Sequence, residues 1–360
     1  MRGFIMTVLL MFLAGGADAF AQGNLVEVYK LPNETEHYVS QTHYNYSRVA
    51  EQLTRGCRTD LEKIEAIYDW ITRNIAYDTT YTIHTADECF DQRKGVCQAY
   101  CELFYRIATA AGLRVEIISG ISRDIYGRVR NSGHAWLFAY TRENHGILLD
   151  PTWDAGAVNG TEFIREKYHR SWFGVDPKWM ILTHFPKDPS YQLLPEPMTE
   201  EDFRSLDYPF SLQYIYGFDV DQMYSRARAH TLSMPKVYSG CVGDFVLLEA
   251  PLESSLLMGR SYTFRIRVKC DKEFILIAGG RWYSTASGDW VDEGNGVYSI
   301  VFTPKSPGDV HLGMRVANSN SAATAVAYGV TPSDGEPGNG ELEVVTLKTS
   351  IGEVLASMKE

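Results

Sequence analysis

Hydrophobic positions along the chain predict a buried helix followed by an antiparallel pair of strands. After Gly95, apolar residues recur at steps of three and four through residue 111, and Gly112 follows as a C-terminal cap. Residues 133–141 alternate as a strand instead, which puts His134 and Trp136 on the same face. Residues 146–150 form the returning strand of this predicted hairpin.

The turn between these strands decides where Asp150 lies. If the turn centres near Glu143, Asp150 lies opposite Trp136 and shares a face with His134, one diagonal step away and within side-chain reach. If the turn is instead a two-residue loop at residues 144–145, Asp150 lies on the opposite face. The pattern alone leaves both registers open.

The rest of the chain changes character partway, which predicts two domains. Thr59 and Glu62 form a capping-box pattern that opens a helix through Ala76, and residues 22–230 are rich in helical patterns and tyrosine. Proline residues within 194–206 indicate a surface strap toward the linker. Beyond it, short strand-like runs separated by turn residues predict a β-sandwich over 231–360, at 245–249, 262–268, 273–278, 297–303 and 310–316. We expect a mobile loop over 332–341 and a last strand at 342–347.

The N-terminal residues have the pattern of a secretory signal peptide. Arg2 precedes an apolar stretch over residues 4–13, and Ala19 and Ala21 provide a small-x-small cleavage site, so we expect residues 1–21 to be removed. This stretch is too short to span a membrane, and no cysteine for lipid attachment follows it. We therefore expect a periplasmic or secreted protein without a membrane span. Its net charge of −11 argues against binding to nucleic acid.

The sequence contains six cysteines, none of them in a zinc-binding spacing, and no metal or cofactor is expected. An exported protein can form disulfides, and Cys241 and Cys270 could bridge strands of the sandwich, but the sequence does not decide the pairing of these two or of Cys57 and Cys89. Cys101 lies one turn after Cys97 and is assigned to packing.

Cys97 falls in the first turn of the predicted buried helix. There, unpaired backbone N–H groups and the positive end of the helix dipole lower a thiol pKa, and the same groups can hold an oxyanion. The alternative is a buried structural cysteine, a common environment for this residue.

Cys97, His134 and Asp150 together can perform acyl transfer. A thiolate attacks a carbonyl, an imidazole moves the proton and a carboxylate orients the imidazole. Taken singly, His134 could be a core histidine and Asp150 a turn residue before Pro151. The three local settings together favour the chemical interpretation. His169 and His184 could line the cleft, but we expect them to be structural.

Three segments carry a family resemblance, namely residues 94–100 (KGVCQAY), 133–136 (GHAW) and 149–153 (LDPTW). They resemble the core of the transglutaminase-like superfamily, which is papain-like in architecture. The similarity covers roughly residues 45–220, and segments at 64–78, 172–177, 183–186 and 191–194 resemble the kyphoscoliosis-peptidase branch and its bacterial relatives. Where the family usually has Gly and Ala at the second and fourth positions after the cysteine, this chain has Ala99 and Cys101.

The resemblance implies an α+β fold, with a papain/transglutaminase-like core ahead of the sandwich, which we expect to be immunoglobulin-like. It also implies that Cys97 is the nucleophile, His134 the general base and acid, and Asp150 the orienting carboxylate. We therefore expect an exported cysteine peptidase or amidase that acts through a thioester on a protein, peptide or cell-wall peptide. A cross-linking amine transferase and a non-catalytic binding module remain the alternatives, and the oligomeric state is left open.

Overall fold

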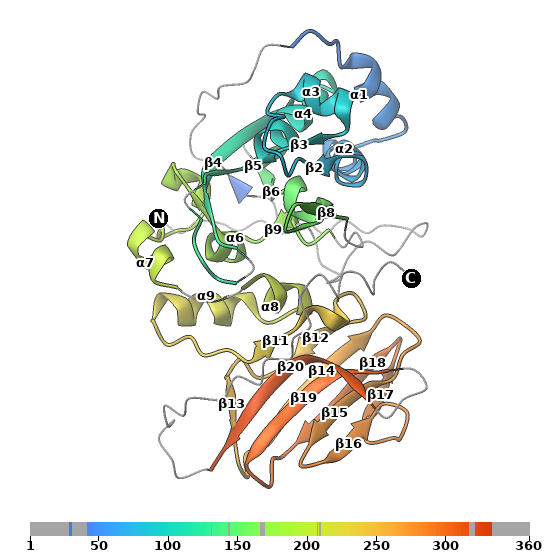
Figure 1. Ribbon diagram of the computed structural model, residues 1–360, viewed down its shortest axis with the longest axis vertical. Helices are drawn as coiled ribbons and strands as arrows, with labels where there is room; N and C mark the ends of the chain where they lie inside the picture. The colour runs from blue at the N-terminus through green and yellow to red at the C-terminus, as the bar shows by residue number, and fades with distance from the viewer. Residues whose placement is uncertain are drawn as a thin grey trace. The chain divides into compact units, whose positions relative to one another are not determined.

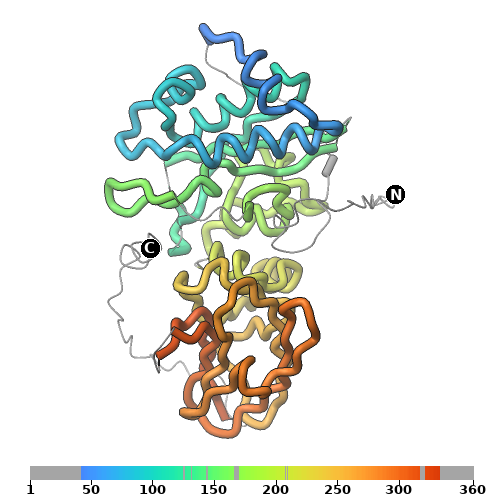
Figure 2. The backbone as a smooth tube through the Cα atoms, turned by 90° about the vertical axis from the view of Figure 1, so that its right-hand side faces the viewer, coloured from blue at the N-terminus to red at the C-terminus, as the bar shows by residue number. Residues whose placement is uncertain are grey.

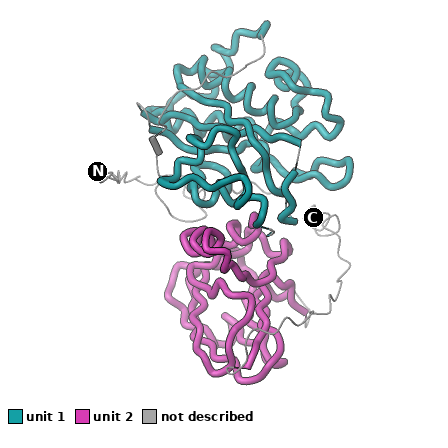
Figure 3. Tube along the Cα trace, turned by 90° about the vertical axis from the view of Figure 1, so that its left-hand side faces the viewer, with its two compact units in different colours: residues 1–208 teal, residues 209–360 magenta. Residues whose placement is uncertain are grey.

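The computed structural model describes residues 29–30, 42–124, 126–130, 132–142, 145–165, 170–206, 208, 210–316 and 321–332. The chain divides into two compact units, residues 1–208 and 209–360 (Figure 3). The predicted catalytic domain extended to residue 230, whereas helices α8 (Phe210–Tyr216) and α9 (Val220–Arg228) group with the second unit. The predicted signal peptide, the loop residues 333–341 and the strand at 342–347 lie outside the described residues.

The first unit combines helices with a six-stranded antiparallel sheet, and so has the expected mixture of helix and sheet (Figure 1). The sheet has the order β1-β6-β5-β4-β10, with β9 paired to β6, and these strands are β1 (Tyr29–Lys30), β4 (Val115–Ser122), β5 (His134–Arg142), β6 (His145–Leu149), β9 (Phe173–Val175) and β10 (His184–Pro186). Two small two-stranded sheets accompany it, formed by β2 (Ala76–Tyr77) with β3 (Lys94–Gly95) and by β7 (Ala157–Asn159) with β8 (Glu162–Ile164). The helices are α1 (Ser47–Leu53), α2 (Asp60–Asn74), α3 (Ala86–Gln92), α4 (Cys97–Ala110), α5 (Pro151–Ala155), α6 (Pro177–Thr183), α7 (Glu200–Ser205) and the 3₁₀ turn η1 (Pro189–Gln192).

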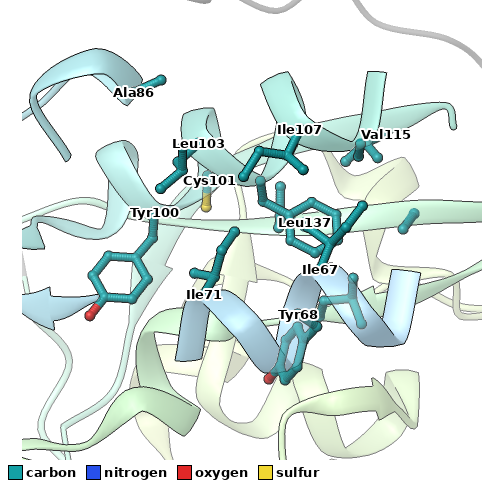
Figure 4. Close-up of a cluster of buried hydrophobic side chains, with 14 of the residues drawn as sticks. Ile67, Tyr68, Ile71, Ala86, Tyr100, Cys101, Leu103, Ile107, Val115 and Leu137 are labelled. Atoms are coloured by element: carbon teal, nitrogen blue, oxygen red, sulfur yellow. The ribbon is translucent and has the colours of Figure 1, made fainter. Parts of the chain in front are cut away.

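The two long helices form where the sequence predicted them. The capping box of Thr59 and Glu62 opens α2, and α4 ends two residues before Gly112, which takes a positive φ of 79°. α4 is central in the hydrophobic core, because its buried side chains meet those of α2, α3 and the inner faces of β4, β5 and β6 (Figure 4). Cys101 belongs to this cluster and is fully buried, as expected for a packing residue.

The predicted surface strap is anchored to the first unit. It contains α7, whose Phe203 is buried beneath the guanidinium of Arg123, 4.6 Å from the ring centroid. Arg123 is itself 1% exposed and donates hydrogen bonds to backbone carbonyls of Leu182, Gly127 and Phe203. This buried cation therefore joins the end of β4 to α6 and α7.

The second unit is built mainly of strands, in two sheets. One sheet has the order β11-β20-β19-β15-β16, with β13 paired to β20, and the other has the order β12-β14-β18-β17. Figure 2 follows the chain through these strands, coloured orange to red. Their bounds are β11 (Lys236–Val237), β12 (Phe245–Glu249), β13 (Ser255–Leu257), β14 (Tyr262–Val268), β15 (Phe274–Ala278), β16 (Arg281–Ser284), β17 (Val291–Gly294), β18 (Val297–Phe302), β19 (Gly308–Arg315) and β20 (Ala322–Thr331), and η2 (Ser239–Cys241) is a 3₁₀ turn.

Aromatic side chains connect the two sheets of the second unit. Phe245 of β12 contacts Phe274 of β15, with ring centroids 4.7 Å apart, and Phe264 of β14 contacts Tyr328 of β20 at 5.7 Å. All five strand runs expected between residues 245 and 316 form strands. The immunoglobulin-like assignment stays a prediction.

In the part of the chain that the structure describes, no helix is both long enough and apolar enough to cross a bilayer.

Gly120 of β4 allows the backbone of the edge strand β10 to lie close to β4. It pairs with His134 on one side and Pro186 on the other, and a Cβ added to it would lie 2.1 Å from the Phe185 carbonyl oxygen and 2.7 Å from the Trp136 ring. Because the nearest atom belongs to the backbone, the strand itself would have to move.

We predict that Gly120→Ala destabilises the protein by about 1–3 kcal/mol, the usual cost of overpacking a core. Gly133→Ala is the matched control, since its added Cβ would meet only one atom, 3.7 Å away. Denaturant unfolding of the full chain measures both variants. Equal stability of the two would contradict the close approach of β10.

Candidate active site

Cys97 is the first residue of α4, and a short strand pair leads into it. Tyr77 of β2 pairs with Gly95 of β3, and the N–H of Val96 donates to the Ile83 carbonyl at 3.0 Å. Val96 is the N-cap of α4 and offers no side-chain cap. The N–H groups of the first turn therefore receive no hydrogen bond from an N-cap side chain.

Asp78 holds the loop that supports this helix start. Its carboxylate is 1% exposed and accepts five hydrogen bonds, from the backbone N–H and hydroxyl groups of Thr80 and Thr82 and from the N–H of Ile83. Burial opposes its ionisation, but these hydrogen bonds outweigh burial and hold the pKa of Asp78 well below its usual range. Ile83 in turn binds Val96, so Asp78 acts on the segment directly before Cys97.

The register of β5 and β6 brings Asp150 beside His134. Leu137 pairs with Leu149, and extending this register by one residue places Asp150 opposite Trp136. His134 Nε2 lies 2.7 Å from Asp150 Oδ2, within hydrogen-bonding distance. The first of the two predicted registers is therefore the one that forms.

A β-bulge makes this register compatible with the turn. Arg142 pairs with His145, whereas Tyr140 pairs with Gly146, so Thr141 is the extra residue between these two pairs. Without that extra residue, the register set by the Arg142–His145 pair would continue along both strands. Asp150 would then lie on the face of the sheet opposite to His134. Turn length alone does not determine this register, because the bulge shifts the pairing by one residue.

Asp150 is completely buried and accepts four hydrogen bonds. Oδ1 accepts the N–H groups of Thr152 at 2.9 Å and Trp153 at 3.1 Å, as the N-cap of α5. Oδ2 accepts from His134, and His184 Nε2 lies 3.1 Å from the same oxygen. Burial acts to raise the pKa of Asp150, but the charge of His134 and the hydrogen bonds from both histidines hold it well below its usual range.

His184 was assigned to structure by the sequence analysis, and the structure places it against Asp150. It begins β10, fully buried, and its Nδ1 lies 2.8 Å from the Thr183 hydroxyl. The segment 183–186 was noted only for its family resemblance, which gave no signal of this contact. His169, the other histidine considered, lies outside the described residues.

Cys97 and His134 shift each other's pKa in opposite directions. Burial opposes ionisation of the Cys97 thiol, but a hydrogen bond and the charge of His134, with a hydrogen bond from the Ala135 backbone, outweigh it and lower the thiol pKa. Burial acts to lower the pKa of His134, but Asp150 and Cys97 outweigh it and raise that pKa to about 10. Since Nε2 of His134 faces Asp150, Nδ1 is the nitrogen available to the sulfur. The site therefore favours a thiolate–imidazolium pair.

A second buried carboxylate, Asp154, lies behind Asp150. The Tyr68 hydroxyl lies 2.5 Å from Asp154 Oδ2 and 3.0 Å from the Asp150 backbone carbonyl, and the Trp172 N–H donates to Asp154 at 3.0 Å. Burial raises the pKa of Asp154 to about 7, against the lowering effect of the Tyr68 and Trp172 hydrogen bonds. Asp154 therefore changes charge close to neutral pH.

His134, Asp150 and His184 present donor atoms within 4.8 Å of one another, the kind of set that can bind a transition metal. Both histidine Nε2 atoms are engaged with a single Asp150 oxygen, so hydrogen bonding accounts for their closeness. The six cysteines are free thiols in the structure, including the two considered for a bridge, Cys241 and Cys270.

The comparisons with known proteins agree with the fold of the first unit. Residues 47–153 match the family model described as the transglutaminase-like superfamily. The first unit contains a transglutaminase-like domain. The match includes Cys97, His134 and Asp150.

Two curated proteins extend the similarity beyond the transglutaminase-like domain. Kyphoscoliosis peptidase of Homo sapiens is 29% identical over 181 residues, which are 47% of this chain and 27% of that protein. Hillarin of Drosophila melanogaster is 25% identical over 276 residues, which are 64% of this chain and 34% of that protein. The chain thus spans roughly a third or less of the length of these relatives. A crystal structure of a TGase is 15% identical, covering 34% of this chain and 32% of that one, with a TM-score of 0.25.

We predict that Asp78 contributes stability that is lost in acid. Because its folded pKa lies below the ordinary 3.8, the contribution is present above pH 3.8 and disappears as the pH falls further. Asp78→Asn should cost about 1–3 kcal/mol at pH 7, since the amide cannot accept all five hydrogen bonds. Chemical unfolding measures the free energy of unfolding of both proteins, and the difference between them should be smaller at pH 3 than at pH 7. Asp91→Asn, at an exposed carboxylate, should show no such loss.

We also predict that Cys97 reacts faster with iodoacetamide at pH 6 than Cys57 does. Both thiols are partly exposed, but the pKa of Cys57 is raised by burial and neighbouring glutamates. Because the charge of His134 and its hydrogen bond lower the thiol pKa, His134→Ala should abolish the advantage of Cys97. Mass spectrometry of the labelled peptides measures both sites in one sample. Similar rates at the two cysteines would contradict an activated thiol.

Proposed function

We propose that the chain is an exported cysteine hydrolase that cleaves peptide or amide bonds, with Cys97 as the nucleophile, His134 as the general base and acid, and Asp150 as the orienting carboxylate. One observation carries the proposal: His134 bonds Asp150 through Nε2, and its interaction with Cys97 lowers the thiol pKa while its own rises to about 10. A thiolate paired with an imidazolium is the reactive form of a cysteine nucleophile.

In the first half-reaction, the Cys97 thiolate attacks the carbonyl carbon and forms a C–S bond while the carbonyl electron pair moves to oxygen. Cys97 is the first residue of α4, so the N–H groups of the first helical turn are the proposed donors to that oxyanion. The His134 imidazolium then gives its proton to the departing nitrogen, the C–N bond breaks and an amine leaves. The product is a thioester on Cys97.

In the second half-reaction, water replaces the amine. Neutral His134 takes a proton from the water as its oxygen attacks the thioester, and the C–S bond breaks to release a carboxylic acid and restore the thiolate–imidazolium pair. Throughout both steps, Asp150 keeps the proton of His134 on Nε2 and stabilises the imidazolium.

We propose hydrolysis rather than cross-linking as the outcome. Both reactions begin with the same thioester, but transfer to an amine requires a site that keeps out water, which is about 55 molar. The likeness to kyphoscoliosis peptidase, which extends beyond the transglutaminase-like domain, supports the hydrolytic reaction. A protein, peptide or cell-wall peptide is the proposed substrate.

Export and the second unit are further parts of the proposal. Residues 1–21 support a periplasmic or secreted location, because their pattern is that of a signal peptide.

The two contacting sheets of residues 209–360 support an immunoglobulin-like sandwich. In the described part of this unit no cluster of histidine, cysteine and carboxylate donors occurs, so we assign it to substrate or partner binding.

The test supplies the full chain with peptide libraries, cell-wall fragments and, separately, a fluorescent primary amine with a glutamine-rich protein. The proposal expects cleavage that is lost in Cys97→Ser and retained in Cys57→Ser, with no stable amine incorporation. Amine incorporation that depends on Cys97, without cleavage, would replace hydrolysis by cross-linking. No reaction in any assay would favour a binding module.

We predict that Asp150→Asn lowers turnover by a factor on the order of a hundred or more. The asparagine oxygen can still cap Thr152 and Trp153, but its NH₂ group would then face two histidine N–H groups, which forces His134 into the wrong tautomer. Steady-state kinetics on a cleaved peptide, with circular dichroism as the folding control, measures this effect. Full activity in a folded variant would remove Asp150 from the mechanism.

A further inference from the structure

His184 shares one oxygen of Asp150 with His134. Its Nε2 lies 3.1 Å from Asp150 Oδ2, the atom that also bonds His134 Nε2 at 2.7 Å. The two imidazole rings are 5.2 Å apart between centroids, and neither the His184 nor the Asp150 side chain is exposed to solvent. The catalytic mechanism proposed above makes no use of this second histidine.

The surroundings of His184 are aromatic and keep its ring neutral. Trp136, Trp153 and Trp172 lie 5.1, 4.4 and 5.1 Å from it between ring centroids. Burial in this apolar setting, with the charge of His134, outweighs the effect of Asp150 and lowers the pKa of His184 to about 4. At neutral pH the ring therefore carries one N–H.

The hydrogen-bond partners decide which nitrogen carries that proton. Nε2 faces a carboxylate oxygen, which only accepts, so the proton lies on Nε2. Nδ1 is then an acceptor. The Thr183 hydroxyl has one proton and two acceptors within reach, His184 Nδ1 at 2.8 Å and the Met180 carbonyl oxygen at 3.2 Å, and an unprotonated Nδ1 requires that it donates to the nearer one. His184 is thus a fixed donor, unlike His134, whose proton must move.

The carboxylate needs this donor because water does not reach it. Its Oδ1 is satisfied by two backbone N–H groups of α5, while the two histidines are the donors to Oδ2 among the described residues. His184 takes no part in the proposed proton transfer, so its hydrogen bond to Oδ2 does not depend on the charge of His134. A buried carboxylate with an unpaired oxygen would gain a proton more easily.

We propose that His184 is a positioning residue for the reaction, which fixes Oδ2 of Asp150 toward His134 through a permanent Nε2–H hydrogen bond and keeps that carboxylate ionised. This inference rests on the proposed function of Cys97, His134 and Asp150.

Several other titratable groups lie around Asp150, and a pH-dependent test must take their charges into account. His134 faces it from β5, Cys97 lies beyond His134 at the start of α4, and Asp154 interacts with it from the same helix α5. Tyr68 of α2 lies within 3.0 Å of its backbone carbonyl. The pKa of Asp154 is about 7, and Asp150 contributes to raising it, so an Asp154→Asn background separates its titration from the effect of His184.

The experiment compares His184→Gln, whose amide N–H can reach the carboxylate, with His184→Phe, which keeps a ring of similar shape without a donor. The iodoacetamide rate of Cys97 is measured from pH 4 to pH 10 on the full chain. We expect His184→Phe to slow the plateau rate on the order of tenfold, the effect of losing one hydrogen bond to a charged group. Its acid limb should move to higher pH, because an Asp150 carboxylate that is held less firmly stabilises the His134 imidazolium, and with it the Cys97 thiolate, less well. His184→Gln should keep both the rate, within about threefold, and the acid limb.

Two outcomes would overturn the role of His184: an unchanged rate and profile in His184→Phe, or equal losses in both variants, which would indicate ring packing alone. A slow wild-type Cys97 would instead overturn the proposed function. If His184→Phe does not fold, ¹⁵N NMR of the wild-type histidines provides the test, with a neutral Nε2–H tautomer of His184 expected at pH 6. A charged ring or an Nδ1–H tautomer there would contradict the proposal.

Discussion

The buried carboxylate of Asp150 is the interaction on which the first unit depends. It ends β6, begins α5 and receives donors from β5 and β10, so four separate elements meet at one side chain. Burying a charge is costly unless each of its oxygen atoms finds donors. Here the hydrogen bonds that offset the cost of burying Asp150 also hold His134 in place to interact with Cys97. The contacts that stabilise this carboxylate are therefore also the contacts that assemble the site.

A second set of buried polar groups, formed by Tyr68, Asp154 and the Trp172 N–H, stabilises the Asp150 segment. Tyr68 connects the Asp150 carbonyl to Asp154, and Asp154 binds the backbone at Trp172, close to the rings that surround His184. Because Asp154 has a pKa of about 7, this second set of groups gains or loses a charge in the neutral range. The site thus sits in an electrostatic environment that responds to modest changes of pH.

The elements set by local chemistry could be predicted from the sequence, whereas those set by distant contacts could not. The capping box of α2 and the C-terminal glycine of α4 are local signals, and both helices form. β20 was missed, because its alanines and glycine show no apolar–polar alternation, and its pairing with β19 defines it. The bulge at Thr141 and the contact of His184, 34 residues from Asp150 in sequence, likewise have no local signature.

The close approach at Gly120 has a consequence for finding proteins with the same arrangement. β10 delivers His184 to Asp150 only while its backbone lies against a residue without a side chain, two positions before the one that pairs with His184. A larger residue at this position would meet the Phe185 backbone, so in a homologue that has one we expect β10 to lie farther from β4 and its histidine farther from the carboxylate. Glycine at 120 together with histidine at 184 is therefore a two-residue criterion for sorting transglutaminase-like chains into those with one histidine at the carboxylate and those with two.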